Sequence, residues 1–222
     1  MASYPLTLPT SPGIRDIEWI PQSAVATSRS ILTQLSQTYD WQGKTWRVTI
    51  ELPPMSLADA KDWQAWIYEM NGVEGTFWLS DTIGGPGRGT VAGTPLVATG
   101  GQTGQSLDTD GWSNGDNVKA GDWISIYGRL YQILEDATET GGLITLTVWP
   151  NLAAPDANAP ILYGSAAKGI FRLAEFPAFA WGTHHQQEPI TMVAVEAKLW
   201  GAIHALNGDM ILALDDTAIL QN

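Results

Sequence analysis

The residues best suited to chemistry lie in three short stretches of a 222-residue chain. The first, residues 108–116, reads DTDGWSNGD and is rich in the oxygen ligands that Ca²⁺ prefers. The glutamate that closes a calcium loop is missing, because Lys119 stands at that position. We therefore expect a polar turn in which aspartate side chains accept hydrogen bonds from the backbone.

The other two stretches match known sites only in part. Residues 84–90, GGPGRGT, are glycine-rich like a phosphate-binding loop, but its lysine is missing and no helical pattern follows. We interpret them as a flexible linker. His184 and His185, with Glu188 nearby, suggest zinc, yet a zinc-protease helix needs two histidines four residues apart. These histidines are adjacent and Pro189 follows, so we expect a surface loop.

No set of residues predicts a catalytic centre. A nucleophile triad needs serine, histidine and an acid brought together, and the sequence gives no specific sign of one. Asp215 and Asp216 could pair with glutamates as glycosidase acids, but any acidic chain offers such pairs. We therefore expect no enzyme, no cofactor and no metal, with a cell-wall hydrolase as the enzymatic alternative.

The charge balance argues against several classes of partner. The net charge is −12, Lys and Arg together number 11, and no basic run occurs, so we expect no sequence-specific or tight nucleic-acid binding. No run of about eighteen apolar residues is present, which predicts no membrane insertion. The N-terminus lacks the features of a secretory signal. Absence of cysteine excludes disulfides and suits a reducing cytoplasm.

One helix is clearly predicted, over residues 57–70. Ser56 can cap its first turn, and Asp59 suits the positive end of the helix dipole. Asn71-Gly72 supplies the left-handed residue that ends a helix. Apolar residues recur at three- and four-residue spacing and predict one buried stripe, made of Ala60, Trp63, Trp66, Ile67 and Met70.

The rest of the chain predicts strands, so the fold class is mainly β. Residues 17–20 are a first strand, and two alternating runs around the turn at residues 42–44 predict a hairpin. A sheet with the packed helix would comprise residues 1–83 and 168–200. Residues 84–167 would be an inserted β-barrel or sandwich that folds separately, with a hairpin over 123–134 turning at Gly128-Arg129 and a strand over 143–148 closed by Pro150. Residues 170–173 and 190–199 predict returning strands.

Two further groups of residues are candidate contact sites. The extension over residues 201–222 contains an apolar run, which we expect to lie on a neighbouring subunit or, as the alternative, to form the last strand of its own domain; it comprises Met210, Ile211, Leu212 and Leu214. In the inserted unit, four aromatic side chains could stack on sugars, although alternation turns about half of them inward: Trp112, Trp123, Tyr127 and Tyr131.

The order of these motifs resembles one family across about residues 1–198. The motifs are an extended N-terminal segment YPLTLPTSPGIRDIEW, the unit LPPMSLADAKDWQAWIYEMNGVEGTFWLSD, the hairpin AGDWISIYGRLYQIL, and then KGIFRLAEFPAFAWG and ITMVAVEA. Together they resemble the distal tail proteins, which are tail-tip structural proteins of long-tailed bacteriophages. The resemblance implies a β-rich belt domain with one helix. In many relatives the second β-domain is C-terminal, whereas here it interrupts the belt.

The resemblance also implies a function. Such a protein would be a virion structural protein at the tail tip, made in the cytoplasm of the host bacterium. It would form a ring, usually hexameric, that links the tail tube protein to the hub or fibre proteins and leaves a channel for DNA. An acidic channel wall would repel phosphate. The alternative function is a carbohydrate- or receptor-binding module at the tail tip.

Overall fold

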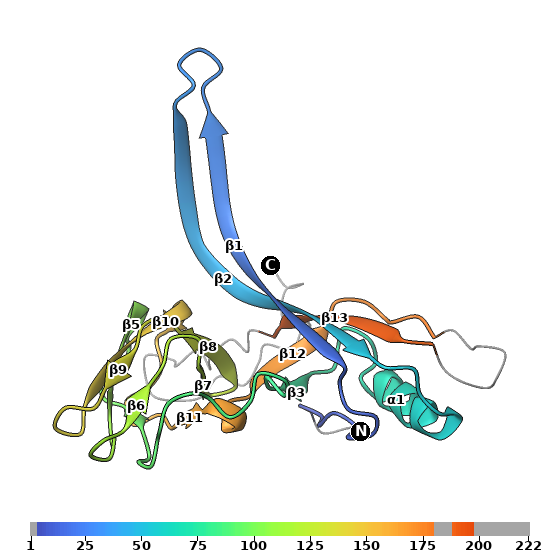
Figure 1. Ribbon diagram of the computed structural model, residues 1–222. Helices are drawn as coiled ribbons and strands as arrows, with labels where there is room; N and C mark the ends of the chain where they lie inside the picture. The colour runs from blue at the N-terminus through green and yellow to red at the C-terminus, as the bar shows by residue number, and fades with distance from the viewer. Residues whose placement is uncertain (1–3, 180–187, 198–222) are drawn as a thin grey trace, which may run out of the picture.

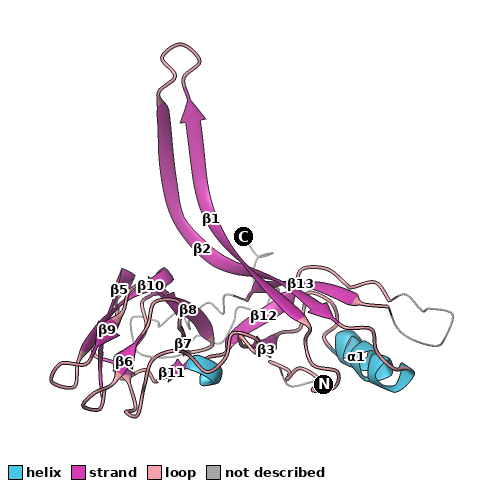
Figure 2. Ribbon diagram, in the orientation of Figure 1, coloured by secondary structure: helices cyan, strands magenta, loops and turns pink. Residues whose placement is uncertain are grey.

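The computed structural model describes residues 4–179 and 188–197. This part of the chain is mainly β, with one α-helix among the described residues (Figures 1 and 2). The elements in chain order are β1 Asp16–Arg29, β2 Ser36–Leu52, α1 Leu57–Glu69, β3 Phe77–Leu79, β4 Leu96–Val97, β5 Thr103–Asp110, β6 Asn117–Val118, β7 Trp123–Ile126, β8 Arg129–Ile133, β9 Ala137–Thr138, β10 Ile144–Ala153, β11 Ile161–Tyr163, the 3-10 turn η1 Gly164–Ala166, β12 Gly169–Leu173 and β13 Ile190–Glu196. None of the described helices is long and apolar enough to cross a membrane.

The first sheet joins segments from both ends of the described chain. Its five strands are ordered β1-β2-β13-β12-β3, and neighbouring strands are antiparallel. Strand β13 lies between β2 and β12, and its alternate side chains Ile190, Met192 and Ala194 are buried. The prediction of a returning strand after residue 189 is therefore confirmed. Strand β13 is central because it pairs with β2 on one side and β12 on the other.

Helix α1 has the predicted cap and the predicted buried stripe. The backbone N–H of Asp59 donates to the Ser56 hydroxyl, 3.3 Å away. Asn71 and Gly72 have positive φ values of 49° and 70° and end the helix. The helix joins a core with the first sheet through its buried residues Ala60, Trp63, Trp66 and Ile67 and its C-cap Met70.

The second sheet is nearly closed and barrel-like, with strand order β11-β7-β8-β10-β5-β4, and β6 pairs with β9 beside it. The hairpin of β7 and β8 is as predicted, but its turn residues are Tyr127-Gly128, one position earlier than expected. Both have positive φ, 50° and 75°, as a tight two-residue hairpin turn requires. Strand β10 does not stop at Pro150 but continues to Ala153, with its register shifting between Thr147 and Leu152.

The predicted turn at residues 42–44 is wrong. Strand β2 runs through these residues, and its partner is the upstream strand β1, so that the actual turn lies between Arg29 and Ser36. Gly43 lies opposite Ala24, where the register of the two strands shifts. A glycine in a strand marks a bulge as readily as a turn. The result is one long hairpin in place of two short elements.

A group of aromatic rings joins the two sheets. Trp123 of β7 lies 4.6 Å from Trp19 and 5.0 Å from Trp46, measured between ring centroids. Trp149 of β10 lies 4.3 Å from Trp46, and Phe171 lies 5.9 Å from Trp19. The rings of β7 and β10 therefore pack directly on β1 and β2. The proposed division of the chain into a belt and an inserted domain stays a prediction.

Strands β7 and β8 contribute to two hydrophobic cores at once. Trp123 and Leu130 belong to the core of the first sheet, whereas Ile124 and Tyr131 belong to the core of the second. The Trp46 indole N–H donates to the Leu130 carbonyl at 3.2 Å. Neither face of the two strands is open to solvent, which explains why seven of their nine residues are buried.

Candidate functional site

The glycine-rich segment at residues 84–93 is bound by a buried carboxylate. Asp122 is only 3 % exposed, and it accepts backbone N–H groups from Arg88 at 2.8 Å, Gly89 at 3.1 Å and Lys119 at 3.0 Å. These amide groups are the ones that a phosphate would need. Because the chain's own carboxylate occupies them, the segment is a hydrogen-bonded connection and neither a phosphate loop nor the loose linker we expected.

Tyr163 completes the hydrogen bonds around this carboxylate. Its hydroxyl donates to Asp122 at 2.6 Å and accepts the Gly89 N–H at 2.8 Å. Burial and the bond to Asp122 raise the pKa of Tyr163 far above its ordinary range. Burial alone would raise the pKa of Asp122, but the hydrogen bonds from Tyr163 and the backbone outweigh it and hold that pKa below its ordinary value.

Asp116 holds the following part of the same segment. It is 2 % exposed and accepts N–H groups from Ala92 at 2.8 Å, Gly93 at 3.0 Å and Ser113 at 2.8 Å. Its pKa is lowered because these hydrogen bonds outweigh the opposing effect of burial. The prediction that aspartates of residues 108–116 bond the backbone is confirmed at this position. The described residues contain no group of three or more His, Asp or Glu that could hold a metal ion.

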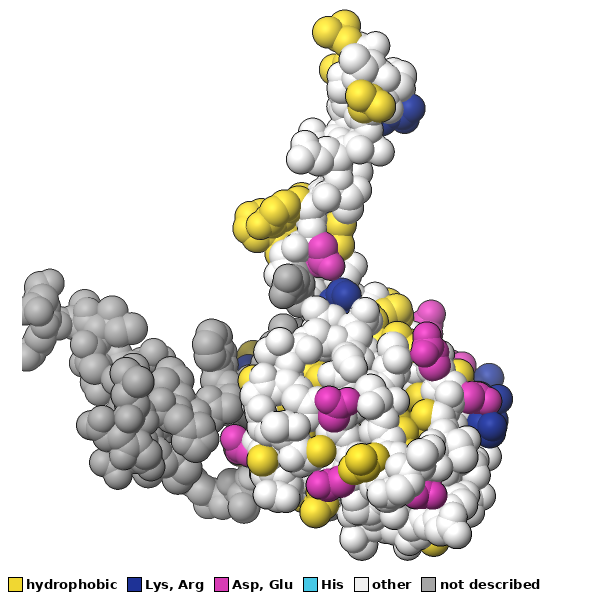
Figure 3. All heavy atoms as spheres, turned by 90° about the vertical axis from the view of Figure 1, so that its left-hand side faces the viewer, with side chains coloured by type: hydrophobic (Ala, Val, Ile, Leu, Met, Phe, Trp, Pro, Cys, Tyr) yellow, Lys and Arg dark blue, Asp and Glu magenta, His cyan; other side chains and the backbone are white. Residues whose placement is uncertain are grey.

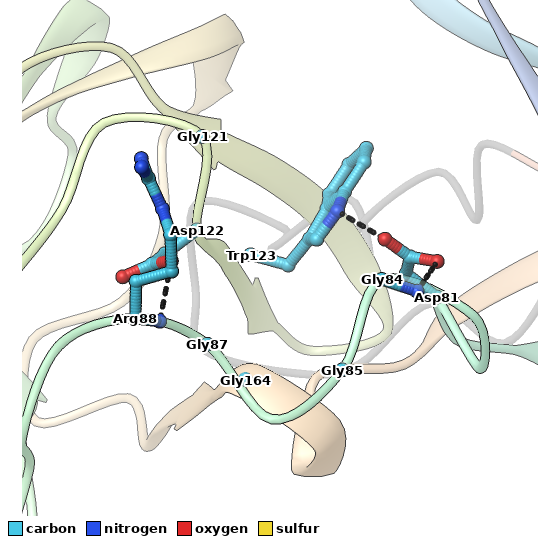
Figure 4. A pocket seen from close by; sticks show the side chains of 9 residues that line it. All are labelled: Asp81, Gly84, Gly85, Gly87, Arg88, Gly121, Asp122, Trp123 and Gly164. Carbon is cyan, nitrogen blue, oxygen red and sulfur yellow. Dashed lines mark hydrogen bonds and ion pairs between the residues drawn. The ribbon is translucent and has the colours of Figure 1, made fainter.

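A small pocket lies beside these contacts (Figure 4). It has a volume of about 80 Å³, below the 300 Å³ or more that is typical of small-molecule sites. Asp81 accepts the indole N–H of Trp123 at 3.0 Å and the N–H of Gly84 at 2.8 Å. The Arg88 guanidinium lies near Asp122, with its Nε 3.9 Å from the carboxylate. These polar groups are already bonded to one another, so we assign the pocket a structural role and do not interpret it as a ligand site.

The sequence also contains a Gly-x-Ser-x-Gly pattern that sequence reasoning passed over, the stretch GWSNG at residues 111–115. A nucleophile of this type sits on a strand–turn–helix. Ser113 instead follows strand β5 in a loop that leads into strand β6. The local structure therefore differs from a nucleophile elbow. His184 and His185 lie outside the described residues.

The predicted sugar-stacking surface does not form. Trp112, Trp123 and Tyr131 are buried, with 5 %, 9 % and 2 % of their surface exposed. Trp112 donates its indole N–H to Thr109 inside the barrel-like sheet, and Trp123 belongs to the aromatic group between the sheets. Tyr127 is 60 % exposed because it occupies the hairpin turn. One ring alone does not make the proposed platform.

The outstanding surface feature is the outer part of the β1–β2 hairpin, residues 23–41, which we call the arm. It projects from the body of the molecule, and every one of its residues is exposed (Figure 1). From Ser23 to Arg29 the paired strands extend by about 20 Å, at about 3.3 Å per residue. A two-stranded ribbon without a packed face is at best marginally stable in water. The arm is therefore suited to bind a partner surface.

Apolar side chains are concentrated on this arm. At its tip, residues 30–35, Ile31, Leu32 and Leu35 are 89 %, 94 % and 73 % exposed. Closer to the body, Tyr39 and Trp41 are 58 % and 66 % exposed, and their rings form an edge-on pair with centroids 4.6 Å apart. Figure 3 shows both groups as yellow patches on the projecting hairpin. Exposed apolar groups of this kind mark interaction surfaces.

The arm is also almost free of charge. The chain has 23 acidic residues, yet none lies between Glu18 and Asp40, and Arg29 is the only basic residue in that interval. Interfaces are depleted of charged residues at their centre and enriched in aromatic ones. The composition of the arm therefore fits a contact with protein.

A groove lies at the other edge of the first sheet. It has a volume of about 500 Å³ and runs between residues 7–14 and residues 78–83. Leu8, Ile14, Trp78 and Ile83 supply its apolar walls. The predicted contact residues of the extension, Met210, Ile211, Leu212 and Leu214, lie outside the described residues. No family model matches this chain, and a search of curated protein sequences finds no match.

Proposed function

We propose that this protein is a virion structural subunit that forms a ring, hexameric by resemblance, at the distal end of a phage tail. The ring would link the tail tube protein to the hub or fibre proteins and leave a channel for DNA. The observation that supports this proposal most strongly is the arm, whose residues are all exposed. A projecting, nearly uncharged hairpin with an apolar tip is suited to permanent assembly.

The free energy gained by burying the apolar side chains of the arm favours several contacts per subunit over one isolated contact. Burying the side chains of Ile31, Leu32 and Leu35 would contribute about 1.5–3 kcal/mol each. Their sum, roughly 5–9 kcal/mol, is comparable to the cost of about 4–15 kcal/mol for bringing two proteins together. Tyr39 and Trp41 would have to add to the contact. In a closed ring each subunit makes two such contacts, so assembly becomes more favourable than the isolated pair.

The charge of the chain is consistent with this role. A net charge of −12 would repel DNA from the wall of a channel, provided that acidic side chains line it. The arm contributes almost nothing to this charge. Contacts that the arm makes between subunits would therefore not be weakened by repulsion between acidic side chains.

The proposal is tested by the oligomeric state of the full chain. Mass photometry and negative-stain images are expected to show closed rings. A variant in which Asn-Gly replaces residues 24–43 joins Ser23 to Lys44 by a tight hairpin turn. It is expected to be monomeric with an unchanged melting temperature. Leu143→Ser is the matched control, because Leu143 is 55 % exposed in the second sheet. A full chain that stays monomeric at all accessible concentrations contradicts the proposal.

The second candidate function is carbohydrate or receptor binding, and one observation favours it. Tyr39 and Trp41 form an exposed aromatic pair, and such rings can stack on the face of a sugar. A glycan array tests this function with the full chain and with Trp41→Ala. Binding that the full chain shows and the variant loses supports it, whereas an array without binding rejects it.

A further inference from the structure

The groove on the first sheet is a preformed feature with anchored walls. The backbone N–H of Leu6 donates to the Thr76 carbonyl at 2.8 Å, and the N–H of Trp78 donates to the Leu6 carbonyl at 2.9 Å. The Trp66 indole of helix α1 donates to the Thr7 carbonyl at 2.8 Å. The N-terminal segment is thus bonded along β3 and to α1, and the space beside it does not depend on a ligand. Its volume of about 500 Å³ falls within the range of binding pockets.

The arm of a chain cannot fill the groove of the same chain. The strand order β1-β2-β13-β12-β3 places the base of the arm at one edge of the sheet and the groove beside β3 at the opposite edge. In Figure 1 the hairpin rises above the body, whereas the N-terminal segment lies below it. An arm that docks in the groove must therefore come from another molecule.

The tip of the arm and the groove match in chemistry. The tip presents Ile31, Leu32 and Leu35, and the groove presents Leu8 and Trp78 between polar threonines at its margin. Among the described residues no acidic side chain lies at the tip or lines the groove, and Lys168 is the one charged residue of that lining, although the whole chain carries 23 acidic residues. Two copies of so acidic a protein repel each other across most surfaces. Contact between these two regions avoids that repulsion.

We propose that the tip of the arm, residues 30–35, docks in the groove between residues 7–14 and 78–83 of a second copy of this chain. This inference rests on the proposed function, because it requires self-assembly, and it specifies the two surfaces that meet. The contact is head-to-tail, since each copy offers a tip to one neighbour and a groove to the other. Such contacts close into a ring when the rotation between copies allows.

Because the whole chain contains no cysteine, any disulfide in the following test must form between the introduced cysteines. Leu32→Cys places a thiol at the tip, and Thr82→Cys places one at the margin of the groove, where both residues are exposed. Mixing the two single variants under oxidising conditions is expected to give a covalent dimer that contains one of each. The variant with both substitutions is expected to give a ladder of covalent oligomers. Leu143→Cys, mixed with Thr82→Cys, is the matched control for random collision.

A second variant blocks the groove without disturbing the fold. Gly13 lines the groove, and a Cβ atom added there meets nothing within 4 Å. Gly13→Trp is expected to abolish the covalent dimer while the melting temperature stays unchanged. Rings that form without the tip-to-groove disulfide overturn this inference and leave the proposed function standing. Leu32→Cys alone giving most of the dimer means that tips meet tips, which also overturns it. Absence of any assembly overturns both proposals.

Discussion

Asp122→Asn is the substitution that most directly tests how the two sheets are connected. The change keeps the shape of the side chain but removes its charge and replaces one acceptor oxygen by a donor. One oxygen of Asp122 accepts the Arg88 N–H, and the other accepts from Gly89, Lys119 and Tyr163. The asparagine oxygen can therefore keep at best the three hydrogen bonds from Gly89, Lys119 and Tyr163. The asparagine NH2 group then faces the Arg88 N–H, which is left without an acceptor.

The expected cost follows from these contacts. A buried donor left without an acceptor costs about 1–3 kcal/mol, and hydrogen bonds to a charged group contribute about 1.5–3 kcal/mol against about 0.5–1.5 for neutral ones. Loss of one bond (about 1–3 kcal/mol) and weakening of three (about 1–1.5 kcal/mol each) therefore sum to about 4–7 kcal/mol. We lower this to about 2–4 kcal/mol, because relaxation and entering water recover part of the loss. For a chain of this size the melting temperature is expected to fall by about 4–16 °C.

The assay is thermal unfolding followed by circular dichroism, with Asp136→Asn as the control. Asp136 also accepts a backbone N–H, from Ala120, but its side chain is 59 % exposed. The control is expected to change the melting temperature little, because contacts of exposed charged groups contribute little to stability. If Asp122→Asn and Asp136→Asn lower the melting temperature equally, the buried carboxylate does not hold residues 84–93 and the reasoning is refuted.

The pH dependence of the same variant provides a second readout. The pKa of Asp122 in the folded protein lies below its ordinary 3.8, despite the opposing effect of burial. Its stabilisation is therefore fully present above that ordinary value and is lost as the pH falls through the lower pKa of the folded state. Between about pH 5 and pH 2 the melting temperature of the unmodified chain should fall more steeply than that of Asp122→Asn. Parallel curves contradict this account.

Three further predictions follow from other parts of the chain. Trp63→Ala should cost about 3–5 kcal/mol in chemical denaturation, because its indole is fully buried, whereas Tyr68→Ala on the exposed side of α1 should have little effect. Replacing residues 84–167 by a Gly-Ser linker should lower the melting temperature of the first sheet, since Trp46 loses its contact with Trp123; an unchanged value would instead support our prediction of independent units. A chain ending at Trp200 should lose association in mass photometry with unchanged melting if residues 201–222 lie on a neighbour, and should misfold if they belong to its own core.

Features that depend on local spacing could be predicted from the sequence. Helix α1 has its cap, its buried stripe and its terminating Asn71-Gly72 within a few residues of one another. The run of apolar residues Ile190, Met192 and Val193 to Val195 predicts a central strand, which β13 is. The aspartate-rich turn was predicted for the same reason, because Asp116 bonds Ser113 only three positions away.

Features that depend on tertiary pairing could not be predicted. Asp122 reaches Arg88 and Gly89 across more than thirty positions, and no spacing rule connects these residues. Gly43 has the signature of a turn, but its partner strand lies upstream and converts it into a bulge. Trp123 is buried because the first sheet covers the outer face of its hairpin, whereas alternation alone suggests that half of such residues are exposed.

The arm escaped prediction for a different reason. Hydrophobic alternation arises when one face of a strand is buried, and both faces of residues 23–41 are exposed. The one alternating pair in this segment, Tyr39 and Trp41, therefore predicts a shorter hairpin that turns at residues 42–44. The usable signal was the charge pattern, because the interval between Glu18 and Asp40 lacks acidic residues in a strongly acidic chain. A segment that folding leaves exposed and that carries only Arg29 and Asp40 as charged residues is suited to contact with another molecule. Such a composition indicates an interface even where periodicity indicates nothing.

In the tip-to-groove contact that we propose, the first sheet would fix the geometry of assembly. The strands of the arm are the outer parts of β1 and β2, beyond the register shift at Gly43, and the N-terminal wall of the groove is bonded to β3 at the far edge of the same sheet. Helix α1 packs on this sheet and also bonds the groove wall through Trp66. The angle between tip and groove is therefore set by the twist of five paired strands and by the core beneath them. Because a ring closes only for particular rotations between neighbours, the packed core of the body would determine how many copies the ring contains.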